Sequence, residues 1–321
     1  MTHYNWGIVG LGRIAAQFSA NFPASQSLTA VAASDLTRAQ AFAKAHQVPR
    51  AYGSYAELFA DPTVDIVYVA TTHNFHYRDI KAALLAGKHV LAEKAITLNS
   101  TELDELIELA ADKQLILMEA QTIYHMPLYP ELVAFASTNQ LGKLRTIQVS
   151  FGSKVPYDPK DRLLNPALAG GALLDIGVYA LSFVRRFMTA TPKLLATTMV
   201  TADTGVDDQS SFLLTNANNE QATVVLNLQA KMPKLGMVAY EGGFFTVDQY
   251  PRSQEAQFTA PDLMQQVIEA GQTEQAFQYE IEDMAKAVET GDNPTLAWTQ
   301  DVMAIMSEAR EQWGFKYPEE N

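Results

Sequence analysis

The sequence predicts an α/β protein in which an N-terminal Rossmann domain with a doubly wound parallel sheet (residues 1–121) precedes a C-terminal α+β domain with a largely antiparallel open sheet (residues 122–321). Three observations lead to this prediction. The first third of the chain alternates short apolar runs with helical patterns, a glycine-rich motif follows the first run, and strand-like runs follow one another after residue 120. Strand–helix alternation indicates a parallel sheet, whereas successive strands favour antiparallel pairing.

The elements of the first domain can be read in order. Its apolar runs do not alternate with polar residues, which is typical of strands buried on both faces of a parallel sheet. Helical spacing fills the segments between them. The expected strands are 6–9, 28–32, 66–70, 89–92 and 115–118, and the expected helices are 13–22, 37–46, 54–60, 76–86 and 100–113.

The second domain is expected to be richer in strands. Turn residues such as Gly242-Gly243 separate its runs, and few helical patterns interrupt them. The expected strands are 143–155, 193–203, 209–217, 221–229, 235–240 and 243–248, and the expected helices are 127–138, 172–188, 277–290 and 299–313.

Composition narrows the functional classes. A chain of 321 residues with 48% hydrophobic and 18% charged residues is expected to fold as two globular domains. The net charge of −13 repels phosphate backbones, so we expect no nucleic-acid partner. No run approaches the roughly 20 apolar residues of a membrane span, and the start carries no signal-peptide pattern, so we expect a cytoplasmic protein. The chain has no cysteine and no metal-ligand spacing.

The segment Gly10-Leu11-Gly12-Arg13-Ile14-Ala15 fits the G-x-G-x-x-A fingerprint of dinucleotide binding. Gly10 allows a tight turn after the first strand, Gly12 lets the backbone approach a pyrophosphate, and Ala15 permits close packing of helix on strand. Arg13 and Ile14 open the helix whose N-terminus would face the phosphates. The motif therefore predicts that NAD or NADP binds here.

The end of the second strand discriminates between these two cofactors. An acid at this place bonds the ribose 2′-hydroxyl of NAD, while a hydroxyl and a cation suit the 2′-phosphate of NADP. Ser34 lies where the acid usually falls, Asp35 follows it, and Arg38 comes one helical turn later. This pattern favours NADP and leaves NAD open.

Four further stretches carry a family resemblance: 31–39 (VAASDLTRA), 52–55 (YGSY), Glu93-Lys94 and 170–179 (GGALLDIGVY). With them the chain resembles the Gfo/Idh/MocA oxidoreductases, and within them the branch of dimeric dihydrodiol dehydrogenase and NADP-dependent xylose dehydrogenase. The resemblance implies hydride transfer between NAD(P) and a sugar, polyol or vicinal diol. It also implies substrate binding between the cofactor and the C-terminal sheet, and a homodimer through that sheet.

The resemblance implies further cofactor contacts. The segment 70–76 (ATTHNFH) places Thr71, His73 and His76 along the cofactor, although both histidines could instead cap or pack the following helix. Glu93-Lys94 matches the family's Glu-Lys-Pro motif with Ala95 in place of proline. The bond before that proline is typically cis in relatives, and the sequence leaves open whether the 94–95 bond is cis or trans.

A catalytic group is expected on the helix that follows Gly170-Gly171. Asp175 and Tyr179 are four residues apart and share one helix face. Oxidation of an alcohol requires a base, and an ammonium near a tyrosine favours the phenolate. The hypothesis is that Tyr179 moves the proton, Lys94 lowers its pKa and polarises the substrate oxygen, and Asp175 orients a second hydroxyl. The alternative makes Lys94 itself the acid and base.

Substrate contacts are expected from Tyr124, His125 and Arg162. Each of these residues could instead serve only in ordinary packing at an interface. Residues 121–127 (QTIYHMP) differ from the aromatic and arginine that dihydrodiol relatives carry there, which makes an aromatic diol a doubtful substrate. Two alternatives stay open: an NAD-dependent inositol or other sugar dehydrogenase, and a dinucleotide-binding sensor without catalysis, which the loss of proline at position 95 favours.

Overall fold

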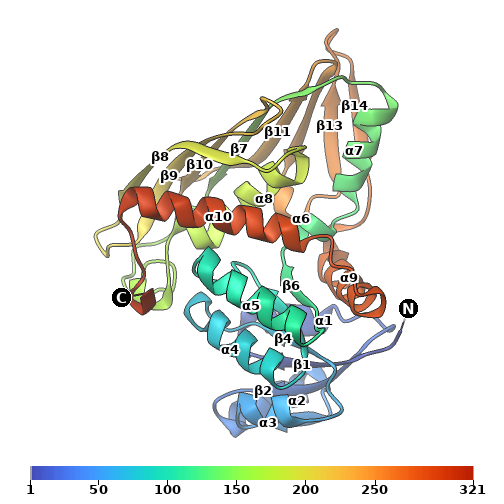
Figure 1. The fold of residues 1–321 in the computed structure, drawn as a ribbon, viewed down its shortest axis with the longest axis vertical. Helices are drawn as coiled ribbons and strands as arrows, with labels where there is room; N and C mark the ends of the chain where they lie inside the picture. The colour runs from blue at the N-terminus through green and yellow to red at the C-terminus, as the bar shows by residue number, and fades with distance from the viewer. Residues whose placement is uncertain (1, 321) are drawn as a thin grey trace. The chain divides into compact units, whose positions relative to one another are not determined.

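The computed structural model describes residues 2–320 and divides the chain into two compact units (Figure 1). Unit 1 runs to Ala120 and includes Phe277–Ala297, and unit 2 comprises Gln121–Ala276 and the chain from Trp298 onward. The fold class expected from the sequence is confirmed, because unit 1 has a parallel sheet and unit 2 a largely antiparallel one.

Unit 1 is built on a six-stranded parallel sheet with the order β3-β2-β1-β4-β5-β6, the strand order of a Rossmann fold. Ligands of such sheets bind outside the carboxyl ends of the strands, where the order reverses, and β1 lies at that point. The short β3 was not expected from the sequence, because its three residues are only partly buried. The strands are β1 Asn5–Val9, β2 Ser27–Ala32, β3 Arg50–Tyr52, β4 Ile66–Val69, β5 His89–Glu93 and β6 Leu117–Ala120.

The helices of unit 1 begin where side chains satisfy their first backbone N–H groups. Asp35 accepts from the N–H of Arg38, Ser54 from Glu57 and Asn99 from Glu102. The helices are α1 Arg13–Ala20, α2 Leu36–His46, α3 Tyr55–Ala60, α4 His73–Leu85, α5 Ser100–Asp112 and α9 Ala276–Thr290.

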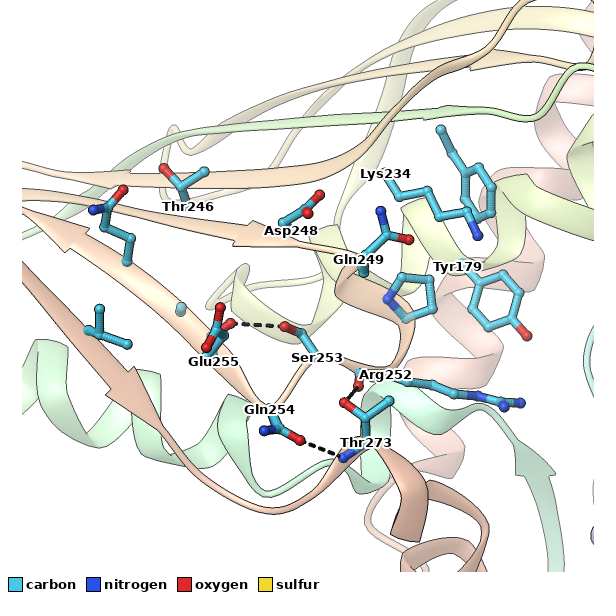
Figure 2. A pocket seen from close by; sticks show the side chains of 15 residues that line it. Tyr179, Lys234, Thr246, Asp248, Gln249, Arg252, Ser253, Gln254, Glu255 and Thr273 are labelled. Atoms are coloured by element: carbon cyan, nitrogen blue, oxygen red, sulfur yellow. Dashed lines mark hydrogen bonds between the residues drawn. The ribbon is translucent and has the colours of Figure 1, made fainter.

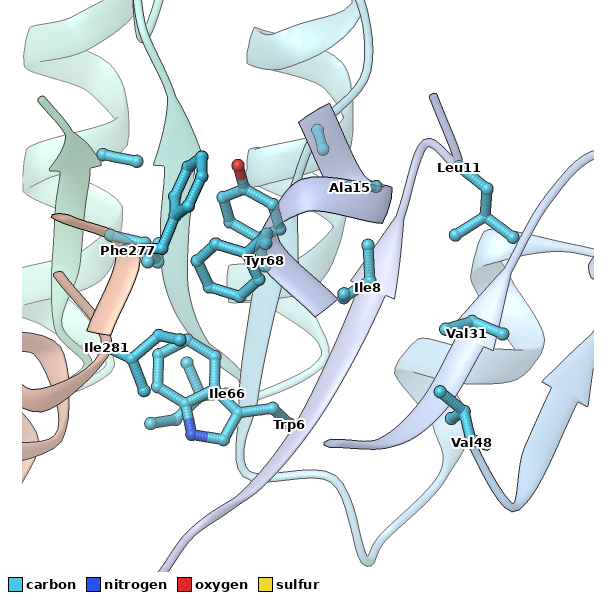
Figure 3. Packing of buried hydrophobic residues seen from close by; sticks show 14 of the residues in the cluster. Trp6, Ile8, Leu11, Ala15, Val31, Val48, Ile66, Tyr68, Phe277 and Ile281 are labelled. Atoms are coloured by element: carbon cyan, nitrogen blue, oxygen red, sulfur yellow. The ribbon is translucent and has the colours of Figure 1, made fainter. Parts of the chain in front are cut away.

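Helix α9 belongs to unit 1, although the sequence analysis placed it in the second domain. Its apolar face, with Phe277 and Ile281, packs into the cluster formed around Trp6, Phe18 and Tyr68 (Figure 3). Within this cluster the rings of Phe18 and Tyr68 stack at 3.8 Å. The chain therefore returns to the Rossmann unit because burial of this face, not position in the sequence, decides where the helix lies.

Unit 2 is built on an eight-stranded sheet with the order β14-β13-β12-β11-β7-β10-β9-β8. Only the β7–β10 pair is parallel, and all other neighbours are antiparallel. The strands are β7 Leu144–Gly152, β8 Lys193–Thr201, β9 Asp207–Thr215, β10 Gln221–Asn227, β11 Met232–Tyr240, β12 Gly243–Asp248, β13 Glu255–Thr259 and β14 Gln265–Glu269.

One face of this sheet carries the core of unit 2. Helix α8 contacts β7, β10 and β11, and buried residues alternate with exposed ones along β9 and β10. The opposite face exposes apolar side chains, among them Leu213, Val225 and Phe244. The remaining helices are α6 Thr122–His125, α7 Leu128–Thr138, the π-helix η2 Leu173–Gly177, α8 Val178–Phe187 and α10 Leu296–Trp313. Strands β13 and β14 and helix α6 were not expected.

The stretch Pro166–Phe187 corrects one expectation. It is 22 residues long and contains an 18-residue window with a mean hydropathy of 1.7, enough by length and composition to cross a membrane, so the statement that no apolar run approaches this length was wrong. Of its most apolar window, 78% is buried inside the protein. This burial is that of a core helix, because α8 lies against the sheet of unit 2.

Candidate functional site

The glycine-rich loop of unit 1 has the geometry that its motif predicts. Gly10 has a φ of +85°, and a Cβ there would lie 2.5 Å from the backbone of Ala70 and Thr71. A Cβ on Gly12 would meet nothing within 4 Å. Gly12 begins α1 without a side-chain cap, so the first N–H groups of the helix stay available. The loop therefore leaves room and donors for a pyrophosphate.

The other motif residues support this loop. Ala15 is fully buried in the cluster of unit 1, and Ile14 packs against the same cluster. Arg13 and Ser34 are exposed. These placements leave Arg13 and Ser34 open to a ligand and assign Ile14 to packing.

Arg38 reaches back to the glycine-rich loop. Its Nη2 donates to the carbonyl of Leu11 at 2.8 Å, and its backbone N–H donates to Asp35 Oδ1 at 2.8 Å. One oxygen of Asp35 is thereby used as the cap of α2. The guanidinium, not the carboxylate, is therefore the charged group that this turn holds against the dinucleotide loop.

His73 and His76, in the first turn of α4, hold the loop that contains Lys94. His73 Nε2 lies 3.1 Å from the carbonyl of Lys94. His76 is fully buried, with Nδ1 2.9 Å from the Ala95 carbonyl and Nε2 2.9 Å from the Thr71 carbonyl. Burial lowers the pKa of His76. Each ring nitrogen of His76 faces a backbone carbonyl of unit 1, which favours a supporting role for this residue, and a direct contact with the cofactor stays a prediction.

The segment around Lys94 is fixed from inside unit 1. Tyr68 donates its hydroxyl to Glu93 Oε1, and the Lys94 N–H lies 3.3 Å from Glu93 Oε2. Glu93 is buried, so its carboxylate serves this loop, and a contact of this residue with the cofactor stays a prediction. The Lys94–Ala95 peptide bond, which the sequence left open, is cis. The Thr71 hydroxyl is buried without a hydrogen-bond partner among residues 2–320, as expected of a polar group kept for a ligand.

In unit 2, Asp175 lies in the π-helix η2 and Tyr179 in the first turn of α8. Arg162 Nη2 contacts Asp175 Oδ1 at 3.1 Å, which brings two of the expected site residues together. The expected continuous α-helix is thus replaced at its start by a π-helix, an element that is frequent at functional sites. Gly177 permits a close approach, because a Cβ there would lie 2.8 Å from Leu226 of β10.

Asp207 of β9 anchors the start of this helix. Its Oδ2 accepts from the Leu173 N–H at 2.7 Å, and its Oδ1 lies where a Cβ of Gly171 would be. Burial raises the pKa of Asp207 to about 7, and the N–H of Leu173 and Arg310 of α10 act in the opposite direction. Sequence reasoning missed this residue, because only the fold brings β9 to Gly171.

Tyr179 lines an open pocket of about 940 Å³ in unit 2 (Figure 2). Its ring lies 6.4 Å from that of Phe151, whose face carries Lys234 Nζ at 4.7 Å from the ring centre. The other pocket residues come from β12 to β14 and the loop between β12 and β13, and include Asp248, Gln249, Arg252, Glu255 and Gln257. No motif in the sequence pointed to these strand residues.

Tyr124 and His125 lie elsewhere in unit 2. Both are buried, and neither lines the pocket of Tyr179. The Tyr124 hydroxyl donates to Ser182 Oγ of α8 at 3.0 Å, and its ring packs on Trp298. The Tyr124 hydroxyl thus joins α6 to α8, and a contact of Tyr124 or His125 with substrate stays a prediction. Within the described range, no group of three or more His, Asp or Glu side chains is arranged to hold a metal ion.

The fold and this site define a nicotinamide-dependent oxidoreductase with a Rossmann unit. Residues 4–121 match the family model "Oxidoreductase family, NAD-binding Rossmann fold", and residues 131–244 match the "GFO/IDH/MocA C-terminal domain". The chain belongs to the Gfo/Idh/MocA family. The sequence-based prediction of family and enzyme class is thereby confirmed.

Individual relatives narrow the comparison. The chain is 33% identical to trans-1,2-dihydrobenzene-1,2-diol dehydrogenase of Xenopus laevis over 98% of this chain and 99% of that protein. It is 39% identical to the human enzyme of the same name over 65% and 64%. A solved structure of KijD10, a 3-ketoreductase from Actinomadura kijaniata in complex with NADP and TDP-benzene, superposes with a TM-score of 0.84 at 25% identity and 96% coverage of both chains.

A levoglucosan dehydrogenase in complex with NADH and levoglucosan superposes with a TM-score of 0.86 at 18% identity. The structure covers 99% of this chain and 100% of that one. At this identity the likeness shows the shared fold.

Proposed function

We propose that this oxidoreductase interconverts a secondary hydroxyl and a carbonyl on a sugar, polyol or vicinal diol, with NADP as the preferred cofactor. Two relatives support this class, because their names describe a diol dehydrogenase and a 3-ketoreductase. The single observation that carries the proposal in this chain is the polar pocket around Tyr179, which offers carboxylate, amide and cationic groups to hydroxyl-rich molecules.

The preference for NADP rests on Arg38. Its bond to the Leu11 carbonyl keeps a cation beside the loop whose Gly12 leaves space for the pyrophosphate. Ser34 occupies the place of the acid that would bond the ribose of NAD, and the next residue, Asp35, uses one carboxylate oxygen as the cap of α2. A guanidinium recognises phosphate through charge-assisted bonds, so this turn suits a 2′-phosphate better than a free ribose.

Within the proposed reaction, Tyr179 transfers the proton of the substrate hydroxyl, and Lys94 supplies the positive charge that favours the ionised phenol and polarises the substrate oxygen. Asp175, held by Arg162, accepts a hydrogen bond from a neighbouring substrate hydroxyl. The nicotinamide, when bound, supplies the hydride chemistry. His73 and His76 keep Lys94 in place through the backbone carbonyls of Lys94 and Ala95.

We further propose a homodimer through the open face of the eight-stranded sheet. This face exposes apolar side chains: Leu213 and Val225 lie on the adjacent strands β9 and β10, and Phe244 lies on β12. A charged residue at Val225 should then produce monomers in size-exclusion chromatography with light scattering. A dimer that tolerates Val225→Glu would argue against this face. We also propose a cytoplasmic location, as expected from the sequence, and fractionation of the native host would test it.

Turnover tests the function directly. The purified protein is assayed with NADP and NAD against pentoses, hexoses, inositols and cyclic vicinal diols, following the nicotinamide absorbance. We expect turnover of at least one member with a higher kcat/KM for NADP than for NAD. Tight NADP binding without turnover of any member in either direction would contradict the proposed substrate class.

A further inference from the structure

The pocket of Tyr179 contains two cations from separate elements. Lys234 lies on β11, and Arg252 closes the 3₁₀ turn Tyr250–Arg252 between β12 and β13. In Figure 2 the side chains of Lys234, Arg252 and Tyr179 lie at one end of the pocket, while Thr246 and Glu255 lie at the other. The end of the pocket nearest the proposed catalytic phenol is therefore the positively charged end.

Lys234 is partly buried, and no carboxylate lies within salt-bridge distance of its Nζ among residues 2–320. The Lys234 ammonium lies over the face of the Phe151 ring, with Nζ 4.7 Å from the ring centre. Burial and the neighbouring Lys231 lower the pKa of Lys234, Asp175 raises it, and Arg252 lowers it again. Asp175 is engaged with Arg162, and the carboxylates of Asp248 and Glu255 line the same pocket as Lys234 and Arg252.

Arg252 is held in place by its backbone. Its carbonyl accepts from Thr273 Oγ1 at 2.8 Å, and its N–H donates to the Gln249 carbonyl at 3.2 Å. Gln249 adopts the left-handed conformation, with φ 47° and ψ 38°, that begins this turn. The guanidinium is thus presented to the pocket by a turn that is fixed at both ends.

Two cations in one pocket of a chain with net charge −13 are not explained by solubility, because the surface as a whole is acidic. Like charges in a partly desolvated pocket repel each other, whereas an anion entering between them gains charge-assisted hydrogen bonds. Asp248 and Glu255 also line the pocket, and they suit the hydroxyl groups of the same molecule.

We propose that Lys234 and Arg252 form an anion subsite, and that the substrate is a sugar derivative carrying a carboxylate or a phosphate. The inference rests on the proposed function, since it places the reacting hydroxyl at Tyr179. It makes Lys234 and Arg252 the residues that determine specificity, and it separates this enzyme from dehydrogenases of neutral diols.

Three compounds that share every ring stereocentre test the proposal: D-glucose, D-glucuronate and D-glucose 6-phosphate, with the galactose series run in parallel. We expect kcat/KM for at least one charged member to exceed that for the neutral sugar by roughly 10- to 100-fold, the range of a charge-assisted bond. The glucuronate and phosphate arms identify which anion the subsite takes. A neutral sugar preferred over both charged members in both series would overturn the inference while leaving the proposed function intact.

The variants Lys234→Met and Arg252→Gln should remove this preference, because each should lower kcat/KM for the charged sugar roughly 10- to 100-fold more than kcat/KM for the neutral sugar. The matched control is Lys231→Met, which removes an exposed neighbouring ammonium that does not line the pocket. Lys234→Arg keeps the charge and should retain most of the preference. Equal losses for charged and neutral substrates in Lys234→Met would contradict an anion subsite.

Calorimetric titration of glucuronate and glucose 6-phosphate makes the test independent of turnover. Binding that depends on Lys234, in a protein that turns over no sugar, would refute the proposed function and preserve the subsite. Absence of binding for both anions, in a protein that turns over neutral sugars, would refute the subsite alone.

Discussion

The buried carboxyl of Asp207 gives the protein a stability that depends on pH in a defined direction. Its side chain accepts from the Leu173 N–H at the start of the helix that carries Asp175 and Tyr179. Burial raises its pKa from 3.8 to about 7, so the folded protein retains a proton that the unfolded chain has lost over this interval. The contribution of the Asp207 carboxyl to the free energy of unfolding is fully present below about pH 4 and is lost as the pH rises through about 7.

The magnitude follows from the size of the shift. The interval from 3.8 to about 7 spans about three pH units, each worth about 1.4 kcal/mol. At pH values above 7 the ionised carboxylate should therefore destabilise the folded protein by about 4 kcal/mol. Asp207→Asn removes the titration and keeps an oxygen that can accept from Leu173. The difference in free energy of unfolding between wild type and Asp207→Asn should therefore fall by about 4 kcal/mol from about pH 4 to about pH 7.5.

Urea unfolding, followed by circular dichroism at several pH values in this interval, measures the difference. Asp262→Asn is the matched control, because Asp262 is exposed in the turn between β13 and β14. The control should show a difference that does not vary with pH. A difference between wild type and Asp207→Asn that also stayed constant across the interval would refute the reasoning about burial.

Four further predictions concern the two sites. Gly12→Ala should raise the Kd for NADP at least about tenfold without loss of stability, whereas Gly10→Ala should destabilise unit 1 by about 1–3 kcal/mol because of its φ of +85°. Titration calorimetry and thermal unfolding check this pair, and equal effects on binding would contradict it. Arg38→Met should raise the Kd for NADP roughly 10- to 100-fold and leave the Kd for NAD nearly unchanged. A larger increase in the Kd for NAD than in that for NADP would mean that this turn recognises NAD. Arg162→Met should lower kcat/KM about tenfold while changing stability by under about 1 kcal/mol, as expected of a partly exposed ion pair. An unchanged kcat/KM would leave Asp175 without the orienting role proposed for it.

Much of the Rossmann unit is predictable from local pattern. Its buried strands are apolar throughout, and its helices carry caps such as Asp35 and Ser54 at their starts. The element missed, β3, is three residues long and only partly buried, so no apolar run marks it. The assignment of α9 to unit 1 depends on tertiary packing of Phe277 and Ile281, which no local pattern contains.

Unit 2 shows where local pattern is insufficient. Strands β13 and β14 carry mostly polar, exposed residues, because one of their faces is open. Their sequence therefore resembles that of a loop. The site motifs around Asp175 and Tyr179 are contiguous and were found from the sequence. Lys234, Arg252 and Asp207 come from distant strands and turns, and their importance arises only when the sheet brings them to the pocket or to Gly171.

The proton-transfer role of Tyr179 is the central claim of this account. Single-turnover hydride transfer in Tyr179→Phe, measured by stopped-flow absorbance of the nicotinamide with the best substrate of the panel, tests it most directly. We predict a rate about 10²- to 10⁴-fold below that of wild type with an unchanged Kd for NADP. A rate close to that of wild type would contradict the account and transfer the acid–base role to Lys94.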